Sequence, residues 1–227
     1  LDLDPEDFAQ PESILFPAAD GQQVHAFFYP PTNSVYCGIK NELPLVIALC
    51  HGGPTGATDS GLNLKIQYWT SRGFAVVDIN YRGSTGFGRD YRHSLTGCWG
   101  IKDVQDTTYA IDHLANQGKI DRQRCIIRGG SAGGYTVLSA LTFTDTFKAG
   151  ASLYGIGDLE MLARDTHKFE ARYLDGLVGP YPQDKATYVA RSPIHHASQL
   201  NCPVIFLQGL EDKVVPPNQA EMMVDIL

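Results

Sequence analysis

The sequence predicts a three-layer α/β fold built on a mostly parallel β-sheet. Short apolar runs alternate along the chain with longer segments in which apolar residues recur at helical spacing, and this alternation is typical of strand–helix–strand units with right-handed crossovers. Some runs are apolar throughout, such as LVIALC at residues 45–50, which is expected of a strand buried on both faces of a parallel sheet. Gly52 and Gly53 follow this run after one residue, at the strand end where open α/β sheets bind ligands.

The length allows one or two domains and is ordinary for a single α/β domain, and the composition is that of a soluble globular protein. The 227 residues are 43% hydrophobic and 19% charged, which is ordinary for such a domain. The sequence contains no run of about 18 apolar residues, so no membrane span is predicted. The net charge of −7 argues against a nucleic-acid partner and against binding to an anionic membrane.

Cysteine usage predicts a reducing compartment, and we expect a cytoplasmic protein. The five cysteines are an odd number without metal-ligand spacing, and Cys50 and Cys125 lie in apolar runs, as buried reduced thiols do. The acidic N-terminus is no signal peptide. Because the first residue is Leu1, we expect the chain to begin inside a longer protein.

In the first half of the chain, we expect residues 1–10 to be a linker and residues 11–227 to form the domain. Strands are expected at 13–17, 23–29, 45–50 and 74–79, with a helix at 62–71.

In the second half, we expect a helix over 101–116 that ends at Gly118. Its predicted buried side carries Val104, Thr108, Ile111 and Leu114. Residues 155–200 have mixed helical character, and they form either a pocket wall or a satellite apolar cluster. Buried strands are expected at 125–127 and 203–208, and a further strand at 148–154. Helices are expected after the strand at 125–127 and at 218–227.

The sequence GGSAGGY at 129–135 predicts a nucleophile elbow at Ser131. An apolar strand precedes it and a helical pattern follows, which is the context that a G-x-S-x-G elbow requires. Glycines remove the Cβ atoms that would clash around a strained serine. The alternative is a glycine-rich turn whose serine only caps the helix. Ser84 lacks this glycine spacing, and we interpret it as structural.

A second glycine-rich loop, HGGPT at 51–55, follows the strand at 45–50. It fits the HGGG-type loop that completes an oxyanion hole, with Gly52 or Gly53 offering a backbone N–H. A plain Gly-Gly-Pro turn is the alternative.

Asp212 is the predicted acid of a catalytic triad. It lies 81 residues after Ser131, directly after the predicted strand at 203–208. On the α/β-hydrolase sheet the chain order is Ser, then Asp or Glu, then His. Glu211 competes for this role, and a solvated Glu-Asp loop is the non-catalytic alternative.

Several motifs together resemble the prolyl oligopeptidase family of serine peptidases, most closely its acylaminoacyl-peptidase and dipeptidyl-aminopeptidase-like branch. They stand in the family's order from about residue 11 to residue 227: HGGPTG at 51–56, NYRGSTGFG at 80–88, WG at 99–100, GGSAGGY at 129–135 and QGLEDKVVPPNQAE at 208–221.

The resemblance implies an α/β-hydrolase domain that cleaves short peptides through an acyl-enzyme on Ser131, without a metal or cofactor. It implies that Asp212 is the triad acid, and the D-x-x-V-P spacing favours Asp212 over Glu211. The oxyanion hole would be formed by the amides of Ala132 and of Gly52 or Gly53. KFEARY at 168–173 resembles a stretch that lines the family's specificity pocket, which implicates Phe169 and Tyr173.

Two features depart from the family pattern. The family usually carries a β-propeller before the hydrolase domain, and its catalytic histidine follows the aspartate by a few tens of residues. These 227 residues include no propeller, and every histidine precedes Asp212. His195 and His196 would give the order Ser–His–Asp, so we interpret them as structural. We interpret His51 as ordering its loop.

We therefore expect a truncated, nearly inactive peptidase domain whose base lies outside the chain. Its sheet should lack a final strand, and the exposed edge would allow homo-oligomers. Two alternatives remain: a carboxylesterase acting on small acyl esters, and a non-catalytic fragment that serves as an interaction scaffold.

Overall fold

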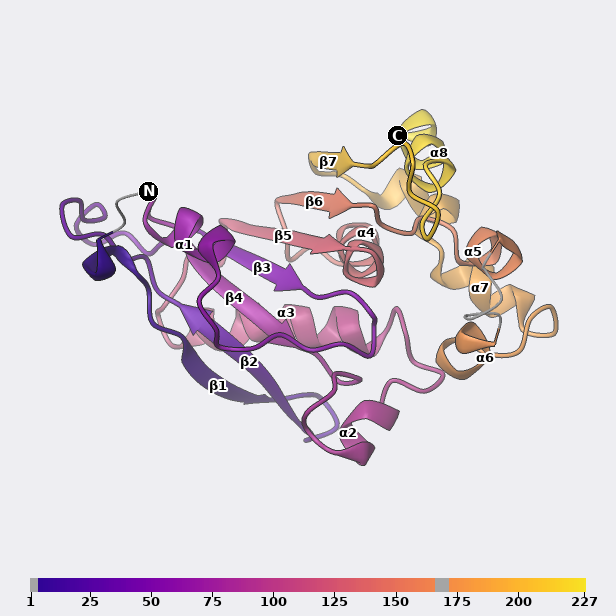
Figure 1. Cartoon of the computed structure of the whole chain (residues 1–227), viewed down its shortest axis with the longest axis horizontal. Helices are drawn as coiled ribbons and strands as arrows, with labels where there is room; N and C mark the ends of the chain where they lie inside the picture. Colours follow the sequence, from indigo (N-terminus) through magenta and orange to yellow (C-terminus); the bar gives the residue numbers. More distant parts are fainter. Residues whose placement is uncertain (1–3, 166–171) are drawn as a thin grey trace.

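A computed structural model describes residues 4–165 and 172–227 of the chain. The described residues form a seven-stranded sheet with the order β1-β2-β4-β3-β5-β6-β7 (Figure 1). The strands are β1 (Glu12–Pro17), β2 (Gln23–Tyr29), β3 (Val46–Cys50), β4 (Ala75–Asn80), β5 (Cys125–Gly130), β6 (Ala149–Leu153) and β7 (Val204–Leu207).

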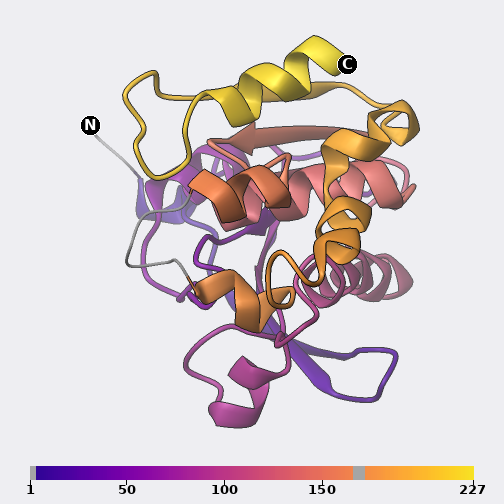
Figure 2. The ribbon, with the colours of Figure 1, turned by 90° about the vertical axis from the view of Figure 1, so that its right-hand side faces the viewer.

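The sheet is mostly parallel, as predicted. Strands β4, β3, β5, β6 and β7 pair in parallel, whereas β2 runs antiparallel to both β1 and β4. Together with the helices on its faces, this sheet gives the α/β-hydrolase class of fold. The parallel strands end at one common edge, and Figure 2 looks onto that edge.

Helices cover both faces of the sheet. The α-helices are α1 (Leu64–Thr70), α2 (Arg89–His93), α3 (Lys102–Asn116), α4 (Ala132–Phe143), α5 (Leu159–Asp165), α6 (Tyr173–Leu177), α7 (Lys185–Arg191) and α8 (Asn218–Ile226). Two 3-10 segments, η1 (Pro5–Asp7) and η2 (Pro193–Gln199), complete the described elements. The short helix α2 directly follows the glycine-rich segment 80–88, in a stretch for which the sequence analysis predicted no helix.

The period-2 alternation of each strand divides the core in two. In β3, Val46 and Ala48 face the larger core, which they share with α3 and α4. Ile47 faces the opposite side and packs with Ile66 of α1. Burial on both faces explains why the β3 sequence is apolar throughout.

The buried side of α3 contains three of the four residues predicted for it, together with others. Val104, Ile111 and Leu114 are buried, but Thr107 is fully buried in place of Thr108. The hydroxyl of Thr107 donates to the carbonyl oxygen of Asp103 at 2.7 Å. This bond satisfies the hydroxyl within the helix, so a polar residue is tolerated in the core.

Strand β7 is not the buried strand that its apolar sequence predicted. It is the outermost strand on its side of the sheet, and Ile205 and Leu207 are 55% and 46% exposed. Its other face, with Val204 and Phe206, packs against the cluster around Leu138 of α4. An edge strand with one uncovered face cannot bury every apolar residue it carries.

Part of the expected linker packs against the domain. Ala9 is buried, its N–H donates to Oε1 of Gln67 at 2.8 Å, and its carbonyl accepts from Nε2 of the same side chain at 3.1 Å. The domain boundary between residues 10 and 11 stays a prediction.

None of the helices in the described ranges combines the length and the apolarity needed to cross a bilayer. The thiols of Cys50 and Cys125 are free and buried, as predicted. Burial raises the pKa of Cys50 to about 12 and that of Cys125 to about 11, so both stay protonated at neutral pH.

Candidate active site

Ser131 lies at the sharp turn between β5 and α4, at the carboxyl edge of the sheet. Its backbone has φ 55° and ψ −124°, which a non-glycine residue adopts only under strain. The residue's own N–H donates to the carbonyl of Leu153 in β6 at 3.0 Å. This strained strand-to-helix turn is the geometry that the G-x-S-x-G pattern predicted.

The flanking glycines allow the elbow to pack against the end of β3. A Cβ on Gly133 would lie 2.8 Å from the carbonyl oxygen of His51 and closer still to that of Cys50. A Cβ on Gly129 would lie 2.9 Å from the Cys50 oxygen. Real Cβ atoms do not approach backbone oxygens so closely, so any side chain at either position would push the nucleophile away from β3.

The glycine-rich loop after β3 lies beside Ser131. The position that a Cβ on Gly52 would occupy is 3.5 Å from the Cβ of Ser131. Among the described residues, no backbone group accepts a hydrogen bond from the N–H of Gly52, Gly53 or Ala132. Ala132 is the first residue of α4, whose N-terminus carries partial positive charge. Free amides near the serine are the donors that an oxyanion hole requires.

His51 is bonded within this loop. Its Nδ1 lies 2.7 Å from the carbonyl oxygen of Gly52, its Nε2 lies 2.7 Å from Oγ of Ser84, and its ring stacks on Tyr81 at 4.3 Å. Burial lowers the pKa of His51, although its bond to Gly52 acts in the opposite direction. Both ring nitrogens are engaged, which is consistent with an ordering role for His51 and a structural role for Ser84.

Asp212 lies in the loop between β7 and α8. Its Oδ1 accepts from the N–H groups of Val214 at 2.9 Å and Val215 at 3.0 Å. Both valines line the same cavity as Ser131, so the loop around Asp212 reaches the site. Glu211, the competing candidate, is exposed. The two bonds from Asp212 to backbone N–H groups two and three residues later give a structural reason for the D-x-x-V-P spacing.

A cavity of about 50 Å³ opens beside Ser131 and is named here the Ser131 cavity. Of the two residues predicted to line a pocket, Tyr173 does so, and Phe169 lies outside the described residues. The pattern analysis missed most of the walls, which also include Gly53, Pro54, Trp99, Ala132, Ile156, Leu162, Leu174, Val214 and Val215. Among these walls, Ile156, Leu162 and Leu174 lie outside every motif quoted above, whereas the others belong to the motifs at 51–56, 99–100, 129–135 and 208–221.

Tyr173 also connects the helical region after β6 to the glycine loop. Its hydroxyl lies 2.7 Å from Oγ1 of Thr55 and accepts from the Thr55 N–H at 3.4 Å. The region 155–200 therefore supplies a pocket wall, which decides between the two interpretations of this stretch. In Figure 2, α5, α6 and α7 lie around the carboxyl edge of the sheet.

His195 and His196 lie at the wrong end of α4 to act on Ser131. The ring of His196 packs edge-on against Phe143, the last residue of α4, at 5.2 Å. Ser131 directly precedes the first turn of the same helix, and 12 residues of helix span about 18 Å. No hydrogen bond or ion pair joins any histidine in residues 4–165 or 172–227 to Asp212.

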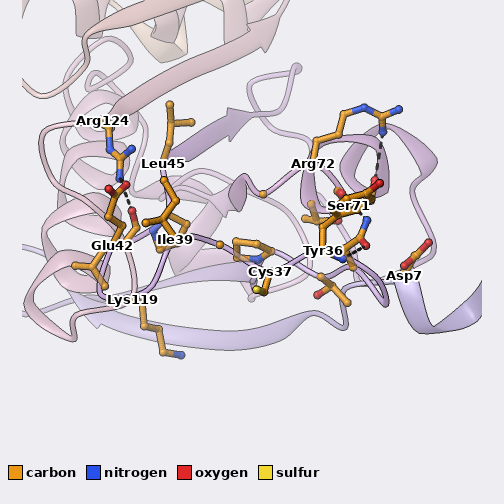
Figure 3. A pocket seen from close by; sticks show the side chains of 18 of the residues that line it. Asp7, Tyr36, Cys37, Ile39, Glu42, Leu45, Ser71, Arg72, Lys119 and Arg124 are labelled. Carbon is orange, nitrogen blue, oxygen red and sulfur yellow. Dashed lines mark hydrogen bonds and ion pairs between the residues drawn. The ribbon is translucent and has the colours of Figure 1, made fainter.

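A larger cavity than the Ser131 cavity lies elsewhere. It is a broad groove of about 1190 Å³ at the amino ends of the parallel strands, opposite to Ser131 (Figure 3). Two of its cations have carboxylate partners: Arg124 pairs with Asp121 and Glu42, and Lys119 pairs with Glu12. Arg72 instead lies over the ring of Tyr68 and donates to the carbonyl oxygen of the same residue. The groove shares no residue with the Ser131 cavity.

Comparison with known proteins agrees with this geometry. The family model described as prolyl oligopeptidase family matches residues 60–227. The chain belongs to the prolyl oligopeptidase family. Dipeptidyl aminopeptidase BIII of Pseudoxanthomonas mexicana is 34% identical over 188 residues, which cover 80% of this chain and 27% of that enzyme. The acylamino-acid-releasing enzyme of Arabidopsis thaliana is 32% identical over 182 residues, covering 75% of this chain and 23% of the relative.

Solved structures of peptidases superpose closely on the chain. A puromycin-hydrolyzing peptidase of Mycobacterium tuberculosis matches 99% of this chain with a TM-score of 0.98 and 46% identity, over 34% of its own chain. An acylaminoacyl peptidase of Pyrococcus horikoshii matches 96% of this chain with a TM-score of 0.88 and 28% identity, over 35% of its own chain. The chain thus spans about a quarter of the length of the curated relatives it matches.

Proposed function

We propose that this chain is the hydrolase domain of a serine peptidase that cleaves short peptides through an acyl-enzyme on Ser131. Membership of a peptidase family supports peptide hydrolysis as the reaction class. The observation that carries the assignment to Ser131 is its strained turn beside free loop amides and an apolar cavity. Strain of this kind concentrates at functional sites.

In the proposed reaction, Oγ of Ser131 attacks the scissile carbonyl and forms a tetrahedral intermediate. The N–H groups of Ala132 and of Gly52 or Gly53 donate to the oxyanion, aided by the N-terminus of α4. Collapse of the intermediate expels the amine and leaves an ester on Ser131, which water then hydrolyses.

Proton transfer requires a base, and we assign it to a histidine outside residues 1–227. Asp212 holds the orienting position in this proposal: one carboxylate oxygen accepts two backbone amides, which fix the carboxylate in its loop. The other oxygen is left to accept from an imidazole N–H.

The substrates we propose are short peptides and aminoacyl amides. The relatives' names, dipeptidyl aminopeptidase and acylamino-acid-releasing enzyme, describe enzymes that act on such bonds. The apolar walls of the Ser131 cavity favour a small uncharged side chain before the scissile bond. The free cysteines support a reducing compartment, and we propose the cytoplasm.

The test is turnover of alanyl p-nitroanilide by the full natural chain that contains residues 1–227. Ser131→Ala should abolish release of p-nitroaniline, and the exposed Ser198→Ala should leave it unchanged. Hydrolysis of p-nitrophenyl acetate without any amide turnover would identify an esterase. Equal amide turnover by Ser131→Ala and the unmodified protein would refute the nucleophile, and no turnover of either substrate would support the scaffold alternative.

A further inference from the structure

Trp99 forms part of the wall of the Ser131 cavity and carries a polar group without a partner. The residue is 2% exposed, and no acceptor in residues 4–165 or 172–227 bonds its indole Nε1. A buried donor that makes no hydrogen bond costs about 1–3 kcal/mol. Native structures rarely leave such a group unpaired, and an unpaired one calls for an explanation.

The backbone around Trp99 is held from several sides. Its N–H donates to the carbonyl of Leu177 at 3.2 Å, and its own carbonyl accepts from Nη1 of Arg191 at 3.2 Å. Its ring packs on that of Tyr135, with the centroids 4.6 Å apart. Because backbone and ring are both fixed, the indole cannot turn its N–H to solvent without breaking these contacts.

Apart from the nucleophile Ser131, whose hydroxyl makes no hydrogen bond to the indole, the walls of the cavity offer no acceptor side chain that is free to pair with this N–H. Ile156, Leu162, Leu174 and Val215 are apolar, and the hydroxyl of Tyr173 is engaged with Thr55. A cavity of about 50 Å³ holds roughly two to four non-hydrogen atoms. It therefore has room for a short side chain of the substrate.

We propose that Trp99 is a specificity-determining residue whose indole N–H donates to an acceptor atom in the side chain that precedes the scissile bond. This inference rests on the proposed function. Ser131 attacks the carbonyl carbon of that residue, so its side chain is the one nearest to the cavity beside the nucleophile. The preferred side chain is short and neutral with an ether, thioether or carbonyl acceptor, because an unpaired carboxylate would be costly to bury among apolar walls.

The experiment compares two isosteric substrates, the p-nitroanilides of O-methylserine and norvaline. Their side chains differ only in one ether oxygen that replaces a methylene group. The readout is the ratio of their kcat/KM values with the full natural chain, and the same ratio with Trp99→Phe, which removes the N–H. The ratio is kcat/KM for the O-methylserine substrate divided by kcat/KM for the norvaline substrate. We expect this ratio to be about 3- to 10-fold higher for the unmodified protein than for Trp99→Phe, which is the effect of one net hydrogen bond.

Both substrates are measured on the same enzyme, so a general loss of activity in Trp99→Phe cancels in the ratio. If that variant does not fold, 3-benzothienylalanine in a Trp69→Phe background replaces only the Trp99 N–H with sulfur. Trp69→Phe alone is the matched control, since Trp69 packs in the core cluster on the other face of the sheet, and it should leave the ratio unchanged.

Equal ratios in the unmodified protein and in Trp99→Phe would overturn the inference. Persistence of turnover in Ser131→Ala would instead overturn the proposed function, which keeps the two failures apart.

Discussion

The carboxylate of Asp103 bonds the hydroxyl of Thr136, with 2.6 Å between Oδ2 and Oγ1. Thr136 belongs to α4, the helix that begins after Ser131, and Asp103 lies in the first turn of α3. The second oxygen of Asp103 accepts from the N–H of Gly100 at 2.7 Å. One buried carboxylate therefore joins the Trp99–Gly100 wall of the cavity to the nucleophile helix.

The first prediction concerns the pH dependence of folding through Asp103. Burial raises its pKa to about 6 from the ordinary 3.8, against the lowering effect of its hydrogen bonds. The folded state therefore keeps the proton to a higher pH than the unfolded chain, and stability falls as pH rises through this window. The free energy of unfolding of Asp103→Asn, relative to the unmodified protein, should rise by about 2–3 kcal/mol between pH 4 and pH 7.

Urea unfolding at pH 4 and pH 7 measures this change. Asn at position 103 can still accept from Gly100, and its amide can donate to Thr136. The matched control is Asp106→Asn. The buried Arg82 pairs with Asp106 at 2.7 Å and with Asp20 at 2.8 Å. Neutralising Asp106 removes one of the two carboxylates that balance this charge, so the variant should be destabilised at pH 7, by at most about 3–5 kcal/mol. The prediction would be contradicted if the free energy of unfolding changed equally between pH 4 and pH 7 in Asp103→Asn and in the unmodified protein.

The second prediction concerns Gly133, two residues after the nucleophile. In Gly133→Ala, the new methyl group meets the carbonyl oxygens of Cys50 and His51, so β3 and α4 must separate. We expect a loss of at least about 3 kcal/mol in the free energy of unfolding, the upper range for overpacking. Gly176→Ala is the control, because no atom lies within 4 Å of its new Cβ. It should change stability by less than about 1 kcal/mol. Similar unfolding midpoints for the two variants would show that the elbow tolerates a side chain.

The third prediction concerns the reactivity of Ser131 in residues 1–227 alone. A serine without a base is a poor nucleophile, so a fluorophosphonate probe should label this chain about 10³-fold or more slowly than the full natural chain. His195→Gln and His196→Gln should not alter the rate, since η2 packs at the far end of α4. The measurement is the labelling rate by intact mass. Fast labelling that either histidine substitution abolishes would place the base within the chain.

The fourth prediction concerns the uncovered face of β7. Exposed apolar residues on an edge strand favour strand pairing between molecules, so residues 1–227 alone should self-associate as concentration rises. Ile205→Lys should reduce the apparent mass in sedimentation velocity. The matched control is Leu15→Lys, which places the same charge on the opposite edge strand β1 at a residue of similar exposure, 52%. Equal masses for both variants would show that association does not use β7.

The sequence by itself was sufficient to predict the alternation of strands and helices, the elbow at Ser131 and the glycine loop around Gly52. These features depend on local geometry. A strained turn excludes side chains and so demands glycine at fixed offsets, and a strand buried on both faces demands an apolar run. The motif spacing around Asp212 has the same origin, because its side chain bonds the amides two and three residues further on.

Tertiary structure alone decided the remaining features. Local patterns could not predict that Trp99 lines the cavity of a serine 32 positions later, or that Asp103 is buried between two helices. Thr107 took the core position expected of Thr108, and the apolar strand β7 is half-exposed. Each of these outcomes depends on which distant elements pack against a residue, because burial and hydrogen-bond partners are set by neighbours in space rather than by neighbours along the chain.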